Sequence, residues 1–277
     1  MQNTIRCQHQ IIDLSQPKVM GILNLTPDSF FDGNKYLSDH DYINRVGEMI
    51  EQGAEIIDIG AVSTRPGSSS ISEEEEVERL FPAVNRILNQ YAGQAIFSID
   101  TSNSKVAQMC FDAGINILND ICGGTNSQLL SLCASYNAPI IIMHMQGNPK
   151  EMQVNPQYED VVSDLIEFFS KQIENAKSHQ VHDIIIDPGF GFGKTLENNF
   201  NLLKSLRVFT VLEKPILVGV SRKSMICKAL NIKPDNALNG TTALHMSALM
   251  SGAKLLRAHD VKEAKEVIDL YVKMQQS

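Results

Sequence analysis

The sequence lacks an excess of basic residues. It contains 24 lysines and arginines against 32 aspartates and glutamates, for a net charge of −8, and no segment forms a basic stripe. Nucleic-acid binding depends on clustered cations that face the phosphates, so we do not expect nucleic acid as a partner. A small anionic ligand is still compatible with this balance, because a local pocket can be positive on an acidic protein.

Paired cysteines and long apolar runs are lacking as well. The 5 cysteines are odd in number and form no CxxC motif, which favours reduced core thiols in a cytosolic protein over disulfides. The N-terminal segment MQNTIRCQHQ lacks the apolar core of a signal peptide. No apolar run approaches the roughly 20 residues that a membrane span needs. We therefore expect a soluble cytoplasmic protein without a membrane partner.

Short apolar runs alternate with longer amphipathic segments along all 277 residues. This alternation is typical of a parallel sheet that helices cover, and its eightfold repetition predicts an α/β fold of the closed (β/α)8 TIM barrel type. An open doubly wound sheet is the alternative. No linker divides the chain, so residues 1–277 are expected to form a single domain in which residues 1–18 cover the N-terminal end of the barrel. The runs are Val19–Leu25, Glu55–Gly60, Ala95–Asp100, Ile115–Asp120, Pro139–His144, Asp183–Asp187, Pro215–Val220 and Ala253–His259.

Helical signals lie between these runs. Apolar residues recur every three or four positions along Tyr158–Gln180, which predicts an amphipathic helix. Ser72 and Glu75 form a capping box at the start of another helix. We interpret the acidic run Glu73–Glu76 as a solvated first turn favoured by the helix dipole rather than as a metal site.

Polar residues end nearly every predicted strand. The ends of parallel barrel strands share one rim, and barrel enzymes carry their active sites there. A single such residue can be an ordinary helix N-cap, as Asp120 and Asp260 could be. The strand-end residues are Asn24, Gly60 with the loop Ser63–Gly67, Asp100, Asn119, Asp120, His144, Asp187, Ser221–Lys223 and Arg257–Asp260.

The segment Ile184–Thr195, IIIDPGFGFGKT, joins an apolar run to an acid and a glycine-rich turn. It resembles a phosphate-binding loop but has Pro188 where that pattern requires glycine. We interpret Asp187 as a carboxylate delivered to the rim by a buried strand. The glycines are expected to let the backbone and Phe192 approach a flat ligand closely.

The rim residues sort by charge into two sets. The cations suit an anion, whereas the acceptors suit a flat heterocycle whose adjacent N–H and NH2 groups donate to one carboxylate. Phe190, Phe192 and Met143 could wall its faces. The alternative is a set of salt bridges that only hold the barrel together. The cations are Arg65, Lys223, Arg257 and His259, and the acceptors are Asp100, Asn119 and Asp187.

Asn24 opens the loop LTPDSFFDGN, which contains Asp28 and Asp32. These oxygen donors could help to hold a Mg2+ ion that binds mainly to substrate phosphates, or they could serve turn formation alone.

Eight motifs in this order resemble those of the bacterial dihydropteroate synthases: MGILNLTPDSFFDG, STRPGS, SIDTS, ILNDI, MHMQGNP, IIDPGFGFGK, GVSRKSMI and LRAHDV. The match spans Val19 to Lys262. The resemblance implies a (β/α)8 barrel transferase of folate biosynthesis, a homodimer and a sulfonamide target. Its reaction joins p-aminobenzoate to 6-hydroxymethyl-7,8-dihydropterin pyrophosphate through loss of Mg2+-bound pyrophosphate and attack by the amine, which gives 7,8-dihydropteroate.

The resemblance also implies a role for individual residues. Asp100, Lys223 and Arg65 would act in catalysis, and Asn24 would contact Mg2+. The pterin would bind to Asp100, Asn119, Met143, Asp187, Phe192 and Lys223. The pyrophosphate would bind to Asn24, Thr64, Arg257 and His259. The p-aminobenzoate would bind to Thr64, Arg65, Pro66, Phe192, Lys223 and Ser224.

Two positions depart from the family pattern: Val62 stands where many relatives have glutamate, and Ala258 where they often have valine. Val62 could change how the loop before Thr64 is tethered. The alternatives are a pterin-binding barrel of the methyltetrahydrofolate methyltransferase type and a non-catalytic pterin-binding paralogue. The motifs TPDSFFDG, STRPG and RAHD argue against the methyltransferase, which needs no pyrophosphate or p-aminobenzoate loop.

Overall fold

The computed structural model describes residues 2–8, 10–25, 39–61, 72–147, 152 and 156–276. Eight parallel strands form a sheet in the order β8-β7-β6-β5-β4-β3-β10-β9. Its two end strands meet at a bridge between Ile186 and Ile216, where the Ile186 N–H donates to Pro215 O at 3.0 Å. The order follows the chain around a closed ring instead of reversing as in a doubly wound sheet. The (β/α)8 barrel is therefore confirmed.

All eight predicted runs contain a strand of this barrel. The run Pro215–Val220 contributes the shortest, because Pro215 has no N–H to donate and the chain turns at Val220, whose carbonyl accepts from Lys223 N at 3.1 Å. The strands are β3 (Lys18–Asn24), β4 (Ile56–Gly60), β5 (Ile96–Asp100), β6 (Ile117–Asp120), β7 (Ile140–Met143), β8 (Ile184–Asp187), β9 (Leu217–Val218) and β10 (Leu255–Ala258).

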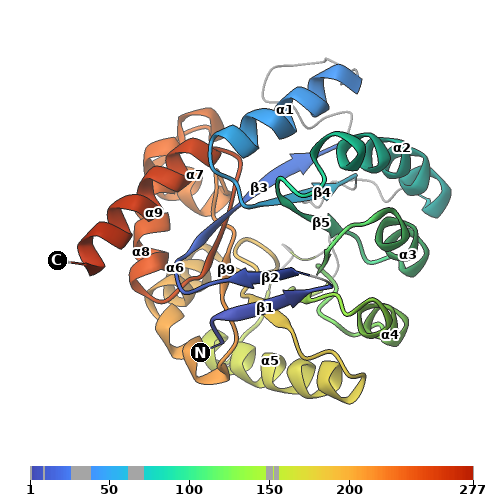
Figure 1. The fold of residues 1–277 in the computed structure, drawn as a ribbon. Helices are drawn as coiled ribbons and strands as arrows, with labels where there is room; N and C mark the ends of the chain where they lie inside the picture. Colours follow the sequence, from blue (N-terminus) through green and yellow to red (C-terminus); the bar gives the residue numbers. More distant parts are fainter. Residues whose placement is uncertain are drawn as a thin grey trace.

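Helices surround the strands (Figure 1). They pack their apolar faces on the outward side chains of the sheet, and together these form the larger of two core clusters. The helices are α1 (Asp39–Glu51), α2 (Glu73–Tyr91), α3 (Ser104–Ala113), α4 (Ser127–Tyr136), α5 (Val161–Ser178), α6 (Leu196–Lys204), α7 (Ser224–Leu230), α8 (Leu238–Met250) and α9 (Val261–Gln275), with 3-10 turns at η1 (Leu206–Leu212) and η2 (Pro234–Asn236). Within the described residues, no helix has the length and apolar character needed to cross a membrane.

Ser72 caps α2 as predicted, and its side chain accepts from Glu75 N at 3.2 Å. The interpretation of Glu73–Glu76 as solvated is wrong for Glu76, which is buried and accepts from Thr101 Oγ1 at 2.6 Å. Glu76 lies on the helix face that packs on the barrel, and a buried carboxyl needs such a donor. Among the described residues, no group of His, Cys, Asp and Glu side chains is arranged to hold a metal ion.

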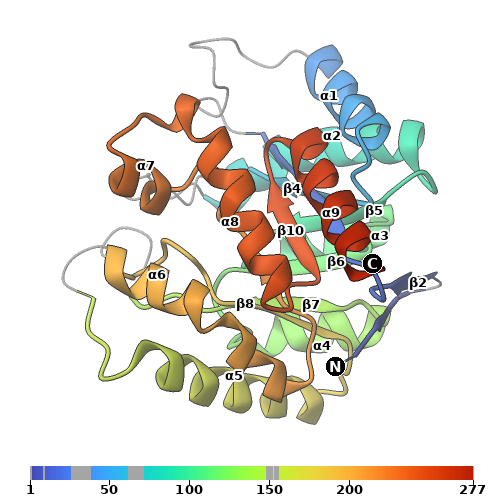
Figure 2. The ribbon, with the colours of Figure 1, turned by 90° about the vertical axis from the view of Figure 1, so that its left-hand side faces the viewer.

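The N-terminal residues cover one end of the barrel, as expected. Strands β1 (Thr4–Cys7) and β2 (Gln10–Asp13) form an antiparallel hairpin that crosses the centre of the ring of helices in Figure 1. Ile5, Ile12 and Leu14 are buried against the first inward-facing residues of the barrel strands, such as Ile56 and Ile185. In the side view of Figure 2 the hairpin lies at one end of the barrel and α7 at the other.

All 5 cysteines are free thiols, as predicted, and Cys7, Cys110 and Cys133 belong to the core. The expectation of core positions is wrong for Cys122, which is exposed, and Cys227 is partly buried. Cys122 follows β6 in the turn toward α4 rather than lying within a strand.

Candidate active site

The inward-facing residues of the barrel follow from strand alternation. Side chains two residues apart share one face of a strand. The inner cluster beside the hairpin includes Met20, Ile56, Ile117, Ile141, Ile185, Leu217 and Leu255. Asp100 ends β5 in register with Gly60 and Asn119. The other residues that face the open mouth of the barrel lie two or four positions after the inner cluster on each strand: Asn24, Asp58, Gly60, Asn119, Met143, Asp187 and Arg257. The mouth thus gathers the predicted pterin acids on one surface.

Arg257 bridges two of these acids. Its Nε donates to Asp58 Oδ2 at 2.7 Å and its Nη2 donates to Asp100 Oδ2 at 3.1 Å. Burial opposes the charge of Arg257, but Asp58 and Asp100 outweigh it and raise the pKa of the guanidinium. The salt-bridge arrangement considered as the alternative is therefore present for Asp100, and it fixes Arg257 in the mouth.

Asp58 is the site residue that the sequence reading missed. It is 0% exposed, and its Oδ2 also accepts from Asn119 Nδ2 at 2.9 Å. The other oxygen, Oδ1, is buried and has no hydrogen-bond partner in the part of the chain that the structure describes. An acid in the middle of the apolar run EIIDIG was the available signal, because a buried carboxylate requires a donor.

The bond to Asp58 orients the side chain of Asn119. A carboxylate oxygen can only accept, so the amide nitrogen of Asn119 must point to Asp58. The amide oxygen of Asn119 is thereby left as the acceptor on the other side. A ligand with an N–H group suits this acceptor.

Asp187 is buried at the end of β8, and its Oδ1 accepts from Gly189 N at 2.8 Å. Burial raises the pKa of Asp187, while Lys223 acts in the opposite direction. Met143, also buried, pairs with Asp187 across the sheet, so an apolar side chain lies on the strand next to the acid.

Lys223 and Phe192 also meet at the mouth. The Lys223 Nζ atom donates to Phe190 O at 2.6 Å and lies 4.6 Å from the centroid of the Phe192 ring. Burial lowers the pKa of Lys223 to about 8, although Asp187 favours its charged form. Phe190 itself is fully buried in the outer core, so the expectation that its ring walls a ligand is wrong.

Burial raises the pKa of Asp100 to about 7, with a further contribution from the negative charge of Asp58 and an opposing one from Arg257. Asp100 thus titrates near neutrality. A positive charge that a ligand brings close to Asp100 would therefore lower the pKa of its carboxyl group.

His259 and Ser224 lie at the outer edge of the mouth. His259 follows β10, is partly buried, and its Nδ1 lies 3.1 Å from Ser221 Oγ, while its backbone N–H donates to the same hydroxyl at 3.2 Å. Ser224 is exposed at the first position of α7. Ser221, which holds the histidine, was a predicted strand-end residue without an assigned role.

Asp120 and Asp260 have structural roles. Asp120 lies on the outward side of β6 and accepts from the backbone N–H groups of Cys122 and Gly124, both at 2.9 Å. Asp260 accepts two bonds from the Arg222 guanidinium, both at 2.8 Å. Asp260 occupies the N-cap position of α9, as suggested, but its side chain makes no capping hydrogen bond there, and the N-cap interpretation is wrong for Asp120, because Asn126 caps the helix that follows it.

Thr64, Arg65 and Pro66 lie outside the described residues, as do Val62, Asp28 and Asp32. The roles expected for them stay predictions. Asn24 is described: it ends β3 in register with Gly60 and is partly buried.

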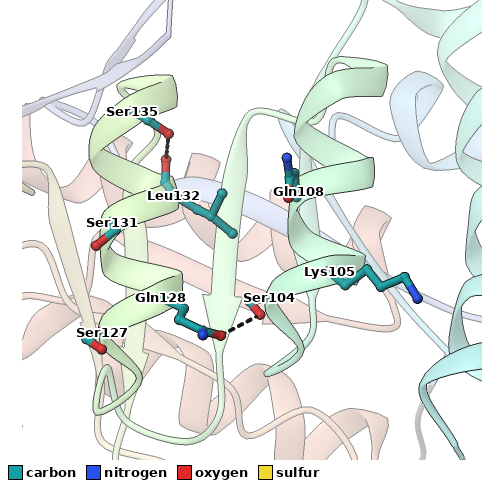
Figure 3. Close-up of a pocket in the computed structure, with 8 residues that line it drawn as sticks. All are labelled: Ser104, Lys105, Gln108, Ser127, Gln128, Ser131, Leu132 and Ser135. Carbon is teal, nitrogen blue, oxygen red and sulfur yellow. Dashed lines mark hydrogen bonds between the residues drawn. The ribbon is translucent and has the colours of Figure 1, made fainter.

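A groove lies elsewhere, on the outer face of the barrel between α3 and α4 (Figure 3). Its lining is polar, and Gln128 and Ser104 bridge it through a hydrogen bond of 3.0 Å. It contains none of the inward-facing acids, so the barrel mouth is the better candidate for the active site. The lining residues are Ser104, Lys105, Gln108, Ser127, Gln128, Ser131, Leu132 and Ser135.

Comparison with known proteins identifies the family of the chain. A family model described as pterin binding enzyme matches residues 20–259. The dihydropteroate synthase of Escherichia coli strain K12 is 43% identical over 259 residues, which cover 93% of this chain and 91% of that protein.

Solved structures agree along nearly the whole chain. The dihydropteroate synthase of Yersinia pestis, in a sulfonamide drug complex, has a TM-score of 0.94 at 38% identity and covers 99% of this chain and 100% of that one. The dihydropteroate synthase of Thermus thermophilus, in complex with 4-aminobenzoate, has a TM-score of 0.89 at 34% identity and covers 98% of this chain and 99% of that one.

Proposed function

Because this chain belongs to the dihydropteroate synthases, within the family of pterin binding enzymes, we propose that its barrel mouth joins p-aminobenzoate to a dihydropterin pyrophosphate. The observation that carries the proposal is the meeting of Asp187, Asn119 and Asp100 on one inward surface, beside Lys223 and Arg257. The reaction forms a bond between the amine nitrogen and the pterin CH2 carbon. It breaks the bond from that carbon to the pyrophosphate oxygen, and the amine loses a proton.

The pterin ring would bind through its donor edge. The Asp187 carboxylate can accept from two adjacent donors of the ring, and the Asn119 amide oxygen is turned away from Asp58 toward the mouth. Met143 and Phe192 would pack on the two faces of the ring. These contacts fix the CH2 group in one place, which lowers the barrier by positioning.

Asp100 would act on the charge that forms at that carbon. Departure of pyrophosphate leaves a cationic carbon conjugated with the ring, and a nearby carboxylate stabilises it electrostatically. The amine of p-aminobenzoate is nucleophilic when neutral, so the site needs to position it rather than activate it. Exclusion of water protects the cation from hydrolysis.

The leaving pyrophosphate would bind to Asn24, Arg257 and His259, together with Thr64. Asn24 supplies an oxygen ligand at the end of β3. A Mg2+ ion that is held mainly by phosphate oxygens and waters needs only one or two protein oxygens as ligands. The described donor set is therefore compatible with Mg2+. When bound, the ion would neutralise charge on the pyrophosphate.

The p-aminobenzoate would bind at the outer edge of the mouth, between Phe192, Lys223 and Ser224, with Thr64, Arg65 and Pro66. Lys223 is suited to its carboxylate because an ammonium group forms charge-assisted hydrogen bonds with carboxylates, and its Nζ atom lies beside the Phe192 ring. Arg65 and Lys223 would thus assist catalysis by holding the nucleophile. The Yersinia pestis and Thermus thermophilus relatives, which bind a sulfonamide and 4-aminobenzoate, support p-aminobenzoate as a substrate and sensitivity to sulfonamides.

The decisive experiment combines the purified protein with dihydropterin pyrophosphate, p-aminobenzoate and Mg2+. We expect dihydropteroate and pyrophosphate in equal amounts. A methyltransferase or a non-catalytic paralogue would bind a pterin and form neither product. Absence of product, under conditions in which the Escherichia coli synthase turns over, would refute the proposal.

The protein is further proposed to act as a homodimer in the cytoplasm. Large apolar side chains are exposed on three late helices: Leu230 on α7 (55%), Met250 on α8 (60%) and Leu270 on α9 (62%). Helices α8 and α9 lie side by side in Figure 2. Light scattering coupled to gel filtration should give twice the chain mass. The free thiols support the proposed cytoplasmic location, because the cytoplasm is a reducing compartment.

A further inference from the structure

Lys194 closes the glycine-rich turn after β8, yet its side chain points back into the protein and is 3% exposed. Its Nζ atom lies 3.0 Å from His144 Nδ1, 3.0 Å from Gly189 O, 3.0 Å from Phe192 O and 3.3 Å from His144 O. An ammonium group has only donors, whereas a neutral amine would turn a lone pair toward one of these acceptors. The acceptors around Nζ therefore favour the charged form, whereas burial opposes it and lowers the pKa of Lys194 to about 7.

His144 serves this contact as a neutral acceptor. Its ring packs edge-on against Phe168 with centroids 4.8 Å apart and lies 6.0 Å from the ring of Tyr158. Burial, followed by the charge of Lys194, lowers the pKa of His144 to about 3. The imidazole at the end of β7 is thus unsuited to acid–base work near neutral pH.

The backbone carbonyl groups of the turn between β8 and α6 accept hydrogen bonds from three side chains. Lys194 donates to the carbonyls of Gly189 and Phe192, and Lys223 donates to that of Phe190 at 2.6 Å. Tyr158 Oη donates to Gly193 O at 2.7 Å. A buried carbonyl without a donor is costly, so this set of bonds fixes the path of the turn.

The turn also touches the segment after β7 backbone to backbone. A Cβ atom on Gly189 would lie 2.0 Å from His144 O, and one on Gly193 would lie 2.4 Å from Gln146 O. Both glycines have positive φ angles, +67° and +60°. These two glycines thus make room for protein backbone, whereas the sequence reading had expected them to make room for a ligand.

We propose that Lys194 is a positioning residue for the pterin site: with His144 it forms a buried clasp that ties the β8–α6 turn to the end of β7. The clasp keeps Phe192 and the Phe190 carbonyl in place, and with them Lys223. Lys194 itself faces carbonyl groups and an imidazole inside the protein, and acts on the ligand through the turn. This inference rests on the proposed function, because it takes the ligand to be a pterin.

The test compares Lys194→Met with Lys214→Met in the full chain. Lys214 is a matched control, because it is also buried, and its Nζ donates to Gln2 Oε1 at 3.1 Å and to His182 O at 3.0 Å, at the hairpin end of the barrel. Calorimetry with dihydropterin pyrophosphate gives affinity, steady-state kinetics separate kcat from KM, and thermal unfolding gives stability.

We expect Lys194→Met to weaken pterin affinity and to raise the KM for the pterin substrate about tenfold, because small displacements of positioning groups have effects of this order. The decrease in kcat should be smaller. Lys214→Met should lower the unfolding temperature and leave the pterin KM unchanged. Wild-type pterin affinity in folded Lys194→Met overturns the proposal. An equal loss of affinity in both variants also overturns it, because the effect would then reflect general destabilisation.

Two further measurements keep the test decisive. If Lys194→Met does not fold, His144→Phe removes the imidazole acceptor of the clasp, and an unchanged pterin KM in that variant overturns the proposal. Turnover by the wild-type protein is measured first. If the wild type binds the pterin without forming product, the proposed function fails, while the affinities of the variants still decide the clasp.

Discussion

Asp58 connects two residues of the barrel mouth that were expected there from the sequence. One of its oxygens accepts from both Arg257 and Asn119, so it orients a cation and an amide together. A fully buried carboxylate is stable only while such donors surround it. The position of the Asn119 amide, which we propose binds the pterin, therefore depends on an acid that lies two residues before the end of β4.

Asp58→Asn should destabilise the fold and weaken pterin binding. Removing one partner of a buried ion pair costs about 3–5 kcal/mol, and the new amide can turn an N–H group toward Asn119. Urea unfolding and pterin calorimetry measure the two effects. Ser98→Ala is the control, since Ser98 pairs with Asp58 across the sheet and its buried hydroxyl has no partner in the described residues. The prediction fails if both variants are equally stable.

Asp187→Asn should reduce pterin affinity about 100-fold, because it replaces a charged acceptor that takes two hydrogen bonds, each worth roughly 1.5 kcal/mol or more. The KM for p-aminobenzoate should change much less, since that substrate binds farther out. Calorimetry and steady-state kinetics check both expectations. Asp120→Asn is a suitable control at the same rim, because Asp120 faces outward onto a turn. Intact pterin affinity in Asp187→Asn would reject the role given to this acid.

At the scale of elements, the alternation of apolar runs was enough to predict the barrel, its eight strands and the covering N-terminal segment. It also predicted where Asp100, Asn119 and Asp187 converge, because strand ends meet at one rim. It could not predict the Arg257–Asp58 pair or the Lys194 clasp. Both join residues that lie far apart in sequence, and such pairing depends on side-chain geometry across the barrel. The buried Glu76 was missed for the same reason, whereas the shortness of β9 follows from Pro215 and the turn at Val220.

The β1–β2 hairpin should contribute to stability and not to the chemistry. Ile5 is 0% exposed in the inner core, so Ile5→Ala is expected to cost about 2–5 kcal/mol. Both KM values should stay unchanged, because the hairpin lies at the end of the barrel opposite to α7 (Figure 2). Ile11→Ala is the matched control, since Ile11 is 72% exposed on the same hairpin. Equal unfolding free energies for the two variants would contradict this assignment.

At the scale of the whole molecule, charge is divided unevenly. The chain has a net charge of −8, yet the mouth that would receive two anionic substrates has three cations in or beneath it, which balance its three acids. The cations are Lys223, Arg257 and Lys194, and the acids are Asp58, Asp100 and Asp187. Buried cations interact with a bound anion more strongly than exposed acids repel it, because water and salt screen the surface charges. Overall acidity argues against nucleic acid as a partner and still permits an anion-binding site.

The same buried charges predict how activity varies with pH. Burial raises the pKa of Asp100 to about 7, so protonation below that pH removes the charge that stabilises the pterin cation. Burial lowers the pKa of Lys223 to about 8, so loss of its proton above that pH removes the cation beside p-aminobenzoate. We therefore expect kcat/KM to fall on both sides of a maximum between these values, since this ratio reports the groups of the free enzyme.

Lys223→Arg separates the two limbs of that profile. A guanidinium stays protonated throughout the range, so the variant should lose the alkaline decline and keep the acid one, even if its maximal rate is lower. Asp120→Asn should keep both limbs. An alkaline limb that stays in place in Lys223→Arg would contradict the assignment. It would point to Lys194, the other buried lysine near Asp187, whose pKa burial lowers to about 7.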